Sequence, residues 1–473
     1  MTDIILINPS YTRLHQGWIE EIAKGSEPFL GIAYIAAMLE KNGFDVKILD
    51  ALAEGSTAND IKKFIKRENP KIVGITVTTP MIPYASDIAK MTKKINKNIK
   101  VLVGGAHPSA VPKETLKNYK HIDYCIIGEG EMTSVELCEA ILRSYPIKKF
   151  YNIKGIAFRD KRKVKITEPR PLISNLDDIP FPSRDLLPMK KYSFSPIKYR
   201  ISPGTNMITS RGCPYNCLFC TKHVFGQRFR QRSVKNIIDE IKLLQEKYDI
   251  KEIHFYDDTF TISEKHVNEF CRAIKKEKID IKFWINGRVN TVNKKMLAML
   301  KKAGCYRIYY GFESATPRII KILNKQDTIE QSMNASKMTR EAGIEVYGFF
   351  ILGNPTETVK EMNATIDFAK KYCDYAHFTS LTPYPGTRLW ADAKKYGKLK
   401  IRGWEDFVQI AMEKPLFVPY TLKQKELTDA LSRAYKSFIF RPSFVFNILK
   451  EIVYQPSKII KYSKGFFALV SGK

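Results

Sequence analysis

Short apolar runs alternate with amphipathic helical stretches in two separate parts of this chain, and that alternation constrains the fold more than any other feature. In residues 1–145 the strand-like runs are Ile4–Asn8, Val46–Asp50, Ile72–Val77, Val101–Gly104 and Tyr124–Ile127. Helical stretches such as GIAYIAAMLEKNG and YASDIAKMTKKINKN lie between them. This alternation predicts a parallel, doubly wound α/β sheet, whose ligands bind at the carboxyl ends of the strands.

The same alternation returns in residues 207–385 with six further strand-like runs. They are Met207–Ser210, Ile253–Tyr256, Phe283–Asn286, Ile308–Phe312, Val346–Leu352 and His377–Thr382. Six successive βα units predict a partial or full βα barrel, with its chemistry at the carboxyl ends of the strands. Residues 146–206 are predicted to be a linker, because the hairpin-like GIAFRDKRKVKITEPR is followed by the Pro-rich NLDDIPFPSRDLLP.

Residues 386–473 are less regular, and we expect a mainly helical C-terminal region. From Arg433 onward, eight Lys and Arg accompany a single acidic residue, with aromatic residues interleaved. The whole chain of 473 residues carries a net charge of +29. This charge predicts either an anionic partner or a Lys-rich solvated surface. The basic tail could contact an anionic membrane, or it could pack on the barrel with its lysines outward.

The sequence also bears on location. No run of eighteen apolar residues occurs, so no membrane-spanning helix is expected. The N-terminal MTDIILINPS lacks the basic region of a signal peptide. A cytoplasmic protein is therefore expected, with a peripheral membrane contact as an option.

Eight cysteines in a chain of this length form no disulfide framework, and five of them are expected to be small buried hydrophobic residues: Cys125, Cys138, Cys271, Cys305 and Cys373.

The other three cysteines stand together in RGCPYNCLFC, as Cys213-x3-Cys217-x2-Cys220. They follow the first predicted barrel strand, on a loop where a barrel site is expected. Three thiolates can hold three irons of a four-iron cluster and leave the fourth iron open for a ligand that is not protein. A zinc site is the alternative, since His223 follows Cys220 by three residues and would complete a Cys3His set. A redox switch is a further option.

On these residues the chain resembles the radical SAM superfamily over roughly residues 200–385. The cysteine spacing is that superfamily's cluster motif, and an aromatic residue before the last cysteine, here Phe219, is also typical. The resemblance implies a [4Fe-4S] cluster whose open iron binds the amino and carboxylate groups of S-adenosylmethionine (SAM). An electron from the cluster then cleaves SAM to methionine and a 5′-deoxyadenosyl radical. An external donor such as flavodoxin or ferredoxin would supply the electron.

Charged residues at the ends of the next strands suit a bound zwitterionic nucleoside. Asp257 and Asp258 end the second strand and could accept hydrogen bonds from the SAM ammonium group. Arg288 ends the third strand and could pair with the SAM carboxylate. For each residue the alternative is a solvated strand end or a structural ion pair.

Two later strand ends suggest contacts to the nucleoside itself. Glu313 and Ser314 end the fourth strand and could bond the ribose hydroxyls. Gly353 ends the fifth, where a bare backbone would let adenine approach closely. The superfamily places a Glu three residues after that glycine, whereas Glu357 is four residues after it here. The role of Glu357 is therefore open.

The first domain resembles the Rossmann-like cobalamin-binding domain of the B12-dependent radical SAM family. The resemblance rests on EPFLGIAYIAAMLEKNGFDVKILDA, GITVTTP, VGGAHPSAVP and IIGEGE. Small residues at the third and fourth strand ends would let the cofactor's tail pass between sheet and helix, and their hydroxyls and amides could bond its phosphate and base. These residues are Thr76, Thr78, Gly104 and Gly105. His107 could contact the corrin edge or cap the next helix.

One departure concerns the cobalt ligand. Mutases and related carriers have Asp-x-His-x-x-Gly after the first strand, whereas PSYTRLHQGWIEE offers only His15 without the Asp and Gly at those positions. No acid is placed to support His15 as a ligand, so we expect cobalt to have no protein histidine below it. A flavodoxin-like domain without cobalamin is the alternative for this half of the chain.

The favoured interpretation is a cobalamin-dependent radical SAM methyltransferase that methylates an unactivated carbon of a lipid, isoprenoid or natural-product substrate. Ring closure or C–C bond formation with the same cofactors is the first alternative. A non-catalytic cobalamin or iron–sulfur sensor is the second. Methylthiolation is disfavoured because residues 1–124 contain no cysteine for a second cluster. A nucleic-acid partner is not expected, since no RNA-binding module is recognisable.

Overall fold

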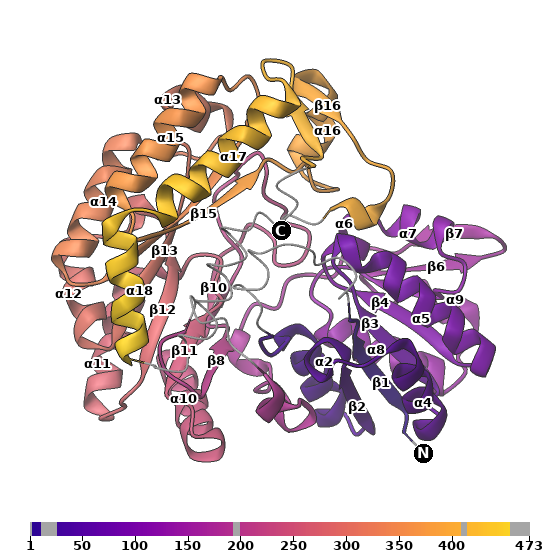
Figure 1. The fold of residues 1–473 in the computed structure, drawn as a ribbon. Coiled ribbons are helices and arrows are strands. Elements are labelled where there is room, and N and C mark those ends of the chain that lie inside the picture. The colour runs from indigo at the N-terminus through magenta and orange to yellow at the C-terminus, as the bar shows by residue number, and fades with distance from the viewer. Residues whose placement is uncertain (1, 11–25, 193–198, 408–413, 455–473) are drawn as a thin grey trace.

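The computed structural model describes residues 2–10, 26–192, 199–407 and 414–454. Two α/β halves lie side by side, each built around its own sheet (Figure 1). The first sheet has seven strands in the order β2-β1-β3-β4-β5-β6-β7. They are β1 Ile4–Asn8, β2 Val46–Asp50, β3 Ile72–Thr76, β4 Lys100–Gly104, β5 Tyr124–Ile126, β6 Ile156–Asp160 and β7 Lys163–Ile166.

The first five strands are parallel, and helices cover both faces of the sheet. Side chains alternate between the faces, so Leu6 and Leu102 pack with one set of helices while Ile5 and Val103 pack with the other. The first set is α2 (Leu30–Lys41) and α8 (Glu131–Leu142). The second includes α4 (Ala58–Glu68), α5 (Ile82–Ile95) and α7 (Pro112–Asn118). The short helices are α3 (Ala51–Glu54), α6 (Ala106–Ala110) and α9 (Ile147–Phe150). The predicted doubly wound sheet is confirmed.

The predicted hairpin is also present, but it does not stand apart from the first sheet. Its two strands, β6 and β7, are antiparallel to each other, and β6 pairs with β5 through Cys125 and Ala157. Part of the predicted linker therefore extends the first sheet.

The second sheet has six parallel strands in the order β15-β14-β13-β12-β11-β8 and forms a partial barrel. Its strands are β8 Gly204–Met207, β11 Glu252–Phe255, β12 Lys282–Gly287, β13 Cys305–Glu313, β14 Glu345–Leu352 and β15 Tyr375–Ser380. The helices cover its outer face (Figure 1). They are α10 Val234–Tyr248, α11 Glu264–Lys276, α12 Lys294–Lys302, α13 Pro317–Ile322, α14 Ile329–Glu341 and α15 Val359–Tyr372.

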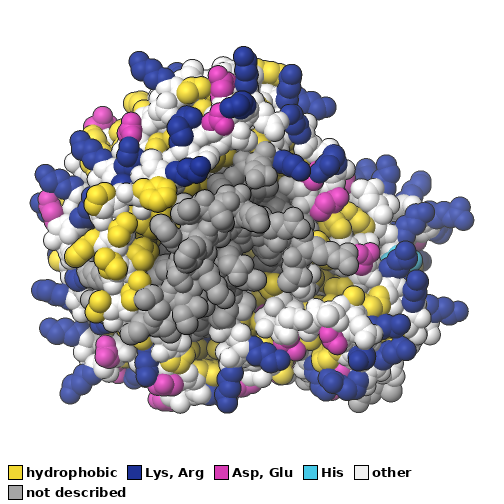
Figure 2. Space-filling view, in the orientation of Figure 1, with side chains coloured by type: hydrophobic (Ala, Val, Ile, Leu, Met, Phe, Trp, Pro, Cys, Tyr) yellow, Lys and Arg dark blue, Asp and Glu magenta, His cyan; other side chains and the backbone are white. Residues whose placement is uncertain are grey.

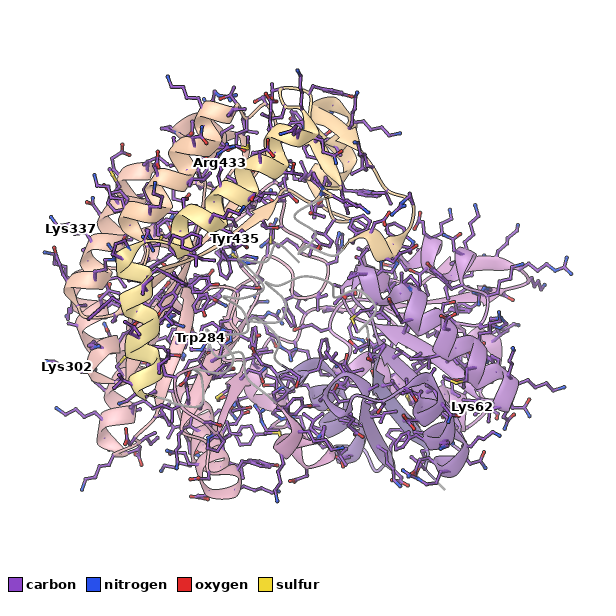
Figure 3. All side chains as sticks on the ribbon, in the orientation of Figure 1. Lys62, Trp284, Lys302, Lys337, Arg433 and Tyr435 are labelled. Carbon is purple, nitrogen blue, oxygen red and sulfur yellow. The ribbon has the colours of Figure 1, made fainter. Side chains whose placement is uncertain are left out.

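The outer face of this sheet is apolar, whereas the inner face carries aromatic rings beside the ion pair that the buried Arg307 forms with Glu345. Residues such as Phe283 and Val346 pack against the outer helices. The inner face instead carries stacked rings, with centroids 4.1 Å apart for Trp284 and Tyr309 and 4.1 Å apart for Tyr309 and Tyr347. Figure 3 shows Trp284 inside the curve of the sheet, while Lys302 and Lys337 point away from it. Stacked rings therefore form part of the inner wall of the barrel.

The first barrel strand differs from its prediction. It ends at Met207 rather than Ser210, and Ser210–Arg211 forms the two-residue strand β9, antiparallel to β10 (Arg230–Gln231). The apolar pattern missed this strand because β8 contains polar residues. Their side chains can be buried because they form hydrogen bonds with other segments. Arg184 donates to Thr205 Oγ1 at 3.0 Å, and Asn206 Nδ2 donates to the Pro28 carbonyl at 2.9 Å.

The C-terminal region contains α16 (Arg388–Tyr396), the antiparallel pair β16 (Gly397–Leu399) and β17 (Phe417–Pro419), α17 (Gln424–Ile439) and α18 (Pro442–Tyr454). Leu427, Leu431 and Phe438 of α17 belong to the barrel core. The choice between membrane contact and packing on the barrel stays open for the basic tail, because residues 455–473 lie outside the described part of the chain. The short 3-10 helix Trp404–Asp406 reaches the first domain, where the Trp404 ring lies 5.0 Å from that of His107. The C-terminal region thus touches both halves.

Two surface features bear on partners. Within the described residues, no helix combines the length and apolarity that crossing a membrane requires. On the face shown in Figure 2, Lys and Arg side chains are spread around the rim over both halves and are interspersed with Asp and Glu. That distribution matches a solvated basic surface better than a single anion-binding stripe.

Candidate functional site

The three cysteines lie on the loop that follows β9, and the structure pins this loop from several sides. Gly212 has φ +82° and lies against the Arg228 carbonyl, so a side chain there would clash with backbone. The Leu218 amide donates to the Leu323 carbonyl at 2.9 Å, and Asn324 Nδ2 donates to the Asn216 carbonyl at 2.7 Å. The loop is therefore held in place by the segment that follows α13.

The thiols lie among groups that suit an anionic cluster. Cys213 and Cys217 are buried and Cys220 is exposed. Arg288 Nη1 lies 3.7 Å from Cys217 Sγ, within reach of an N–H···S contact. The Lys222 ammonium lies near the Cys220 thiol and favours its thiolate. Binding of iron would release protons from this loop.

The zinc alternative does not fit this geometry. The Nε2 of His223 lies 2.8 Å from the Gly386 carbonyl oxygen, so this nitrogen already has a partner outside the cysteine loop. The three thiols alone suit a cluster with an open iron.

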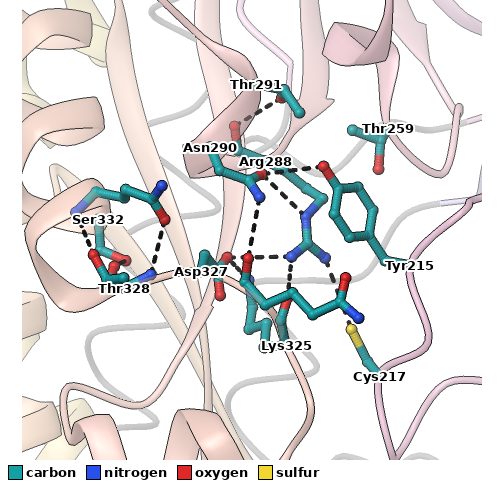
Figure 4. Close-up of polar contacts among 12 residues, drawn as sticks. Tyr215, Cys217, Thr259, Arg288, Asn290, Thr291, Lys325, Asp327, Thr328 and Ser332 are labelled. Carbon is teal, nitrogen blue, oxygen red and sulfur yellow. Dashed lines mark hydrogen bonds and ion pairs between the residues drawn. The ribbon is translucent and has the colours of Figure 1, made fainter.

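Arg288 lies in the site, as expected, but its donors already face protein acceptors (Figure 4). Its guanidinium stacks over the Tyr215 ring at 3.6 Å. Nη2 donates to the Lys325 carbonyl and lies 3.4 Å from Asp327 Oδ2. The expected pairing of Arg288 with the SAM carboxylate would have to compete with these contacts and stays a prediction.

Lys325 and Asp327 were not anticipated from the sequence. Both side chains are nearly fully buried, and Lys325 Nζ donates to Asp327 Oδ2 at 2.6 Å. Asp327 Oδ1 is buried without a partner. The only sequence signal is the charged pair in LNKQDT just before the Thr328 N-cap of α14, which by itself reads as an ordinary helix start.

Glu313 lies where the sequence placed it, at the end of β13. It has φ +64°, a strained value for a residue with a side chain. Burial raises the pKa of its carboxyl to about 7, with Lys325 and Arg288 opposing the rise and Asp327 adding to it. Strain and a shifted pKa together mark a functional position.

Ser314 already has protein partners, and its contact with a ribose stays a prediction. Its hydroxyl lies 3.2 Å from Thr365 Oγ1 and accepts from the Thr316 amide at 3.2 Å. These contacts fix the start of α13 and its packing on α15. The hydroxyl is therefore already engaged away from a ribose.

Asp257 is also engaged within the protein, which corrects its expected role. Its carboxylate accepts hydrogen bonds from the amide and hydroxyl of Thr209 and from those of Ser210. Four donors occupy most of its acceptor capacity, so it anchors the strand that leads into the cysteine loop and is not placed to receive an ammonium group. Asp258, the next residue, is exposed. It remains the freer of the two.

Gly353 is needed for a reason other than adenine. Its φ is +78°, and a Cβ would lie 2.8 Å from Leu427 Cδ2 on α17. Its amide donates to Glu357 Oε2 at 2.7 Å. Burial raises the pKa of Glu357 to about 7 despite its bonds from Asn354 and Gly353. Glu357 therefore closes the turn after β14, and Gly353 lets the C-terminal helix approach it.

The residues of the first domain that were expected to hold the cobalamin tail surround one cavity of ≈ 310 Å³, which we call the tail cavity. Thr76, Thr78, Gly104 and Gly105 all line it. Gly105 has φ +107°, and a Cβ there would lie 2.9 Å from the Val77 carbonyl oxygen, so glycine is required. A Cβ added at Gly104 would have only Ile126 Cβ within 4 Å, at 3.8 Å, so this glycine leaves the cavity open. The space suits an elongated group such as the cobalamin tail.

His107 does not line this cavity, and its contact with the corrin edge stays a prediction beside the helix-cap alternative. Its ring is buried between Thr79 and Trp404, with Nδ1 3.4 Å from Thr79 Oγ1. Burial lowers the pKa of the imidazole to about 4, so the ring is neutral. It joins the first domain to the C-terminal region. His15 lies outside the described residues.

A buried ion network between the two halves was also missed. Arg211 directly precedes Gly212 and pairs with Glu129 at 3.0 Å and Glu131 at 2.6 Å. Arg230 pairs with Glu129 at 2.8 Å. Arg211, Glu129 and Glu131 line the tail cavity, together with Phe225 from the segment after the cysteines. The IIGEGE signature contains these acids, but no sequence pattern names their partners.

Comparisons with known proteins agree with this arrangement. Residues 22–138 match the model of the B12 binding domain, and residues 207–369 match that of the radical SAM superfamily. An uncharacterized methyltransferase of Pyrococcus horikoshii is 41% identical over 445 residues, which covers 94% of each chain. The anaerobic magnesium-protoporphyrin IX monomethyl ester cyclase of Rubrivivax gelatinosus is 29% identical and covers 93% of this chain and 78% of its own.

A solved structure shows the same fold. The radical SAM methyltransferase TsrM of Kitasatospora setae, with cobalamin and a [4Fe-4S] cluster bound, superposes with a TM-score of 0.68 at 20% identity, over 84% of this chain and 75% of TsrM. The protein is thus an enzyme whose cofactors are cobalamin, a [4Fe-4S] cluster and SAM. The chain belongs to the cobalamin-dependent radical SAM family, in which a B12 binding domain precedes a radical SAM domain.

Proposed function

We propose that this enzyme transfers a methyl group from cobalamin to an unactivated carbon of an apolar or aromatic small molecule. The observation that carries the proposal is the tail cavity, which is walled by both halves. Thr76 and Gly104 come from the first domain, and Arg211 and Phe225 come from the two sides of the cysteine loop. A cobalamin whose tail fills this cavity would lie beside the cluster loop, so methyl donor and radical source would share one reaction space.

The balanced reaction consumes two SAM molecules and two electrons for each product. One SAM gives its methyl to the substrate by way of cobalamin and leaves as S-adenosylhomocysteine. The other is cleaved to methionine and 5′-deoxyadenosine, which carries away the substrate's hydrogen atom. The cofactors supply this chemistry, and the protein binds, orients and excludes water. An external flavodoxin or ferredoxin would supply the electrons.

The chain's own residues have separable tasks in this proposal. Cys213, Cys217 and Cys220 hold the cluster, and Arg288 lies against Cys217. Glu313, whose carboxyl titrates near neutrality, accepts from the ribose hydroxyls of SAM. Asp258 stays the proposed acceptor for the SAM ammonium.

The inner wall of the barrel suggests the substrate class. Tyr256 and Phe349 are 39% and 36% exposed, although their strand neighbours are packed. Phe349 lies 5.6 Å from Tyr309 and 6.0 Å from His377, centroid to centroid. Exposed rings backed by a rigid aromatic stack suit a planar or apolar substrate, such as an isoprenoid, a lipid or an aromatic natural product.

Product accounting tests the proposal. Anaerobically reconstituted enzyme would receive cobalamin, a reductant, methyl-labelled SAM and fractionated apolar metabolites. We expect one fraction to gain the label while S-adenosylhomocysteine and 5′-deoxyadenosine form in equal amounts. Phe349→Ala should raise the KM for that fraction, whereas Leu243→Ala, on the outer surface of α10, should not. A fraction consumed with 5′-deoxyadenosine but without S-adenosylhomocysteine would contradict methyl transfer and favour ring closure.

We further propose a peripheral contact with anionic lipid through α18. Val445, Phe446, Leu449 and Val453 are 49–80% exposed, and the exposed Lys436 precedes them. Apolar side chains beside basic ones suit an anionic bilayer surface. Co-sedimentation with phosphatidylglycerol vesicles should fall in Phe446→Asp, while Tyr420→Asp, at an exposed site away from α18, should bind as wild type. Equal binding by wild type and Phe446→Asp would exclude this contact.

A further inference from the structure

The tail cavity reaches deep into the first domain and changes character along its length. It lies between one face of the sheet and helices α2 and α8. Thr76 marks its upper end, and Ile4, which pairs with Ile72, marks its lower end. Four residues at about 3.3 Å each give a depth of about 13 Å along the strands. The lower part is lined by apolar side chains and a buried thiol: Ile4, Leu6, Leu39, Leu102 and Cys138.

One polar atom in this wall has no partner. Ser134, on α8, lines the cavity and is 2% exposed, and its hydroxyl makes no hydrogen bond. A helical serine often bonds the carbonyl four residues earlier. Here the Gly130 carbonyl receives only the Ser134 backbone amide, at 2.7 Å. Among the described residues that line the cavity, Ser134 alone has a buried side-chain N or O atom without a partner.

The charged side chains in the cavity wall are already paired with each other. Arg211 bonds both Glu129 and Glu131, and Glu129 also accepts from the Ile173 amide at 2.8 Å. They neutralise one another at the rim and offer little to a neutral group lower down. A buried hydroxyl left bare is unfavourable unless a ligand atom bonds it.

We propose that Ser134 selects the base of the cobalamin tail, an inference that rests on the proposed function. With the base in the cavity and away from cobalt, the ring nitrogen that cobalt would otherwise bind is a free acceptor, and the Ser134 hydroxyl donates to it. The apolar lower part then receives the hydrocarbon edge of the ring. A benzimidazole base meets both requirements.

Two other kinds of base fail one requirement each. A phenolic base has no ring nitrogen, so Ser134 stays without a partner. Adenine has the ring nitrogen, but its amine and remaining nitrogens would enter the apolar part beside Leu6 and Leu39 and lose their hydration. The cavity therefore favours benzimidazolyl cobamides over both others.

Equilibrium dialysis of the full-length apoprotein with three cobamides tests this selectivity. The probes are cobalamin, p-cresolyl cobamide and adeninyl cobamide. Ser134→Ala should weaken cobalamin binding about three- to tenfold, the range of one neutral hydrogen bond, and leave p-cresolyl cobamide binding within about twofold. Equal losses for both probes, or no loss for either, would overturn the proposal. If wild type bound adeninyl cobamide as tightly as cobalamin, the claim that the apolar lower part of the cavity disfavours adenine would be wrong.

The stability of the apoprotein separates this role from a structural one. Because Ser134 has no partner, Ser134→Ala should not lower the melting temperature. Ser109→Ala is the matched control: Ser109 is also buried, but its hydroxyl accepts from the Gly128 amide at 3.0 Å. It should lower the melting temperature and weaken both cobamides alike. If wild type bound no cobamide at all, the proposed function itself would fail, an outcome distinct from cobalamin binding that ignores Ser134.

Discussion

Arg211 Nη2 lies 2.6 Å from Glu131 Oε1, and this buried contact joins the cysteine loop to the first turn of α8. Both side chains are about 5% exposed. Arg211 also lies over the rings of Tyr34 and Phe225, at 5.4 and 5.1 Å. One side chain thus connects the tail cavity, the cluster loop and the seam between the two halves.

Removing the charge of Glu131 should destabilise the protein strongly. Glu131→Gln leaves the buried Arg211 with one charged partner fewer, and breaking a buried pair typically costs about 3–5 kcal/mol. Urea unfolding of the apoprotein measures the change. Asp239→Asn is the control, because Asp239 pairs with Lys235 on an exposed helix face and should cost less than about 1 kcal/mol. Similar losses in the free energy of unfolding for both variants would show that the buried network stabilises the protein no more than an exposed ion pair.

Gly105→Ala should impair cobalamin binding through backbone strain and a clash. Its φ of +107° disfavours any side chain, and the added Cβ would meet the Val77 carbonyl at 2.9 Å. Gly43→Ala separates the two causes, since Gly43 also has positive φ but nothing within 4 Å of its Cβ position. Dialysis with cobalamin should show a clear loss of affinity for the first variant only. Unchanged affinity in Gly105→Ala would mean that this turn does not shape the cavity.

The buried carboxyl of Glu313 should make stability depend on pH. Burial raises the pKa of Glu313 from 4.5 to about 7. Between these values the folded state binds more protons than the unfolded state, so this group makes the free energy of unfolding fall as pH rises. Glu313→Gln should reduce that fall between about pH 4.5 and pH 7 in urea titrations. Glu246→Gln, on the exposed face of α10, should keep the wild-type slope; an unaltered slope in Glu313→Gln would refute the assignment.

Arg288→Gln should make the cluster harder to reduce. Arg288 places a cation and an N–H donor 3.7 Å from Cys217 Sγ, and both stabilise the added electron. Redox titration followed by electron paramagnetic resonance should show a more negative midpoint potential. Arg318→Gln serves for comparison, since Arg318 pairs with Glu361 away from the cysteines. A midpoint potential equal to that of wild type would show that Arg288 does not affect reduction of the cluster.

Pattern and spacing predicted the architecture well, because apolar periodicity reflects burial directly. The five parallel strands of the first sheet and the six strands of the barrel were all anticipated, within three residues at every end. β8 was displaced because Thr205 and Asn206 are polar yet buried, with partners contributed by Arg184 and Pro28. Periodicity cannot reveal a polar residue that is satisfied by a distant segment.

The candidate site was predictable only where a short motif carries it. The cysteine spacing located the cluster loop, and the strand ends located Arg288 and Glu313. Asp257 and Ser314 also lie at strand ends, but their hydrogen bonds turn inward to Thr209 and Thr365. Lys325, Asp327 and the Arg211 network depend on contacts between distant segments, and a single sequence does not record such contacts.

The central claim is methyl transfer by way of cobalamin, and the fate of an isotopic label tests it most directly. Anaerobically reconstituted enzyme with cobalamin and a reductant would receive SAM labelled in its methyl group, and mass spectrometry would locate the label. The account predicts label on the protein-bound cobalamin, together with S-adenosylhomocysteine. Cleavage of SAM to 5′-deoxyadenosine with all of the label retained on methionine, and none on cobalamin, would contradict it.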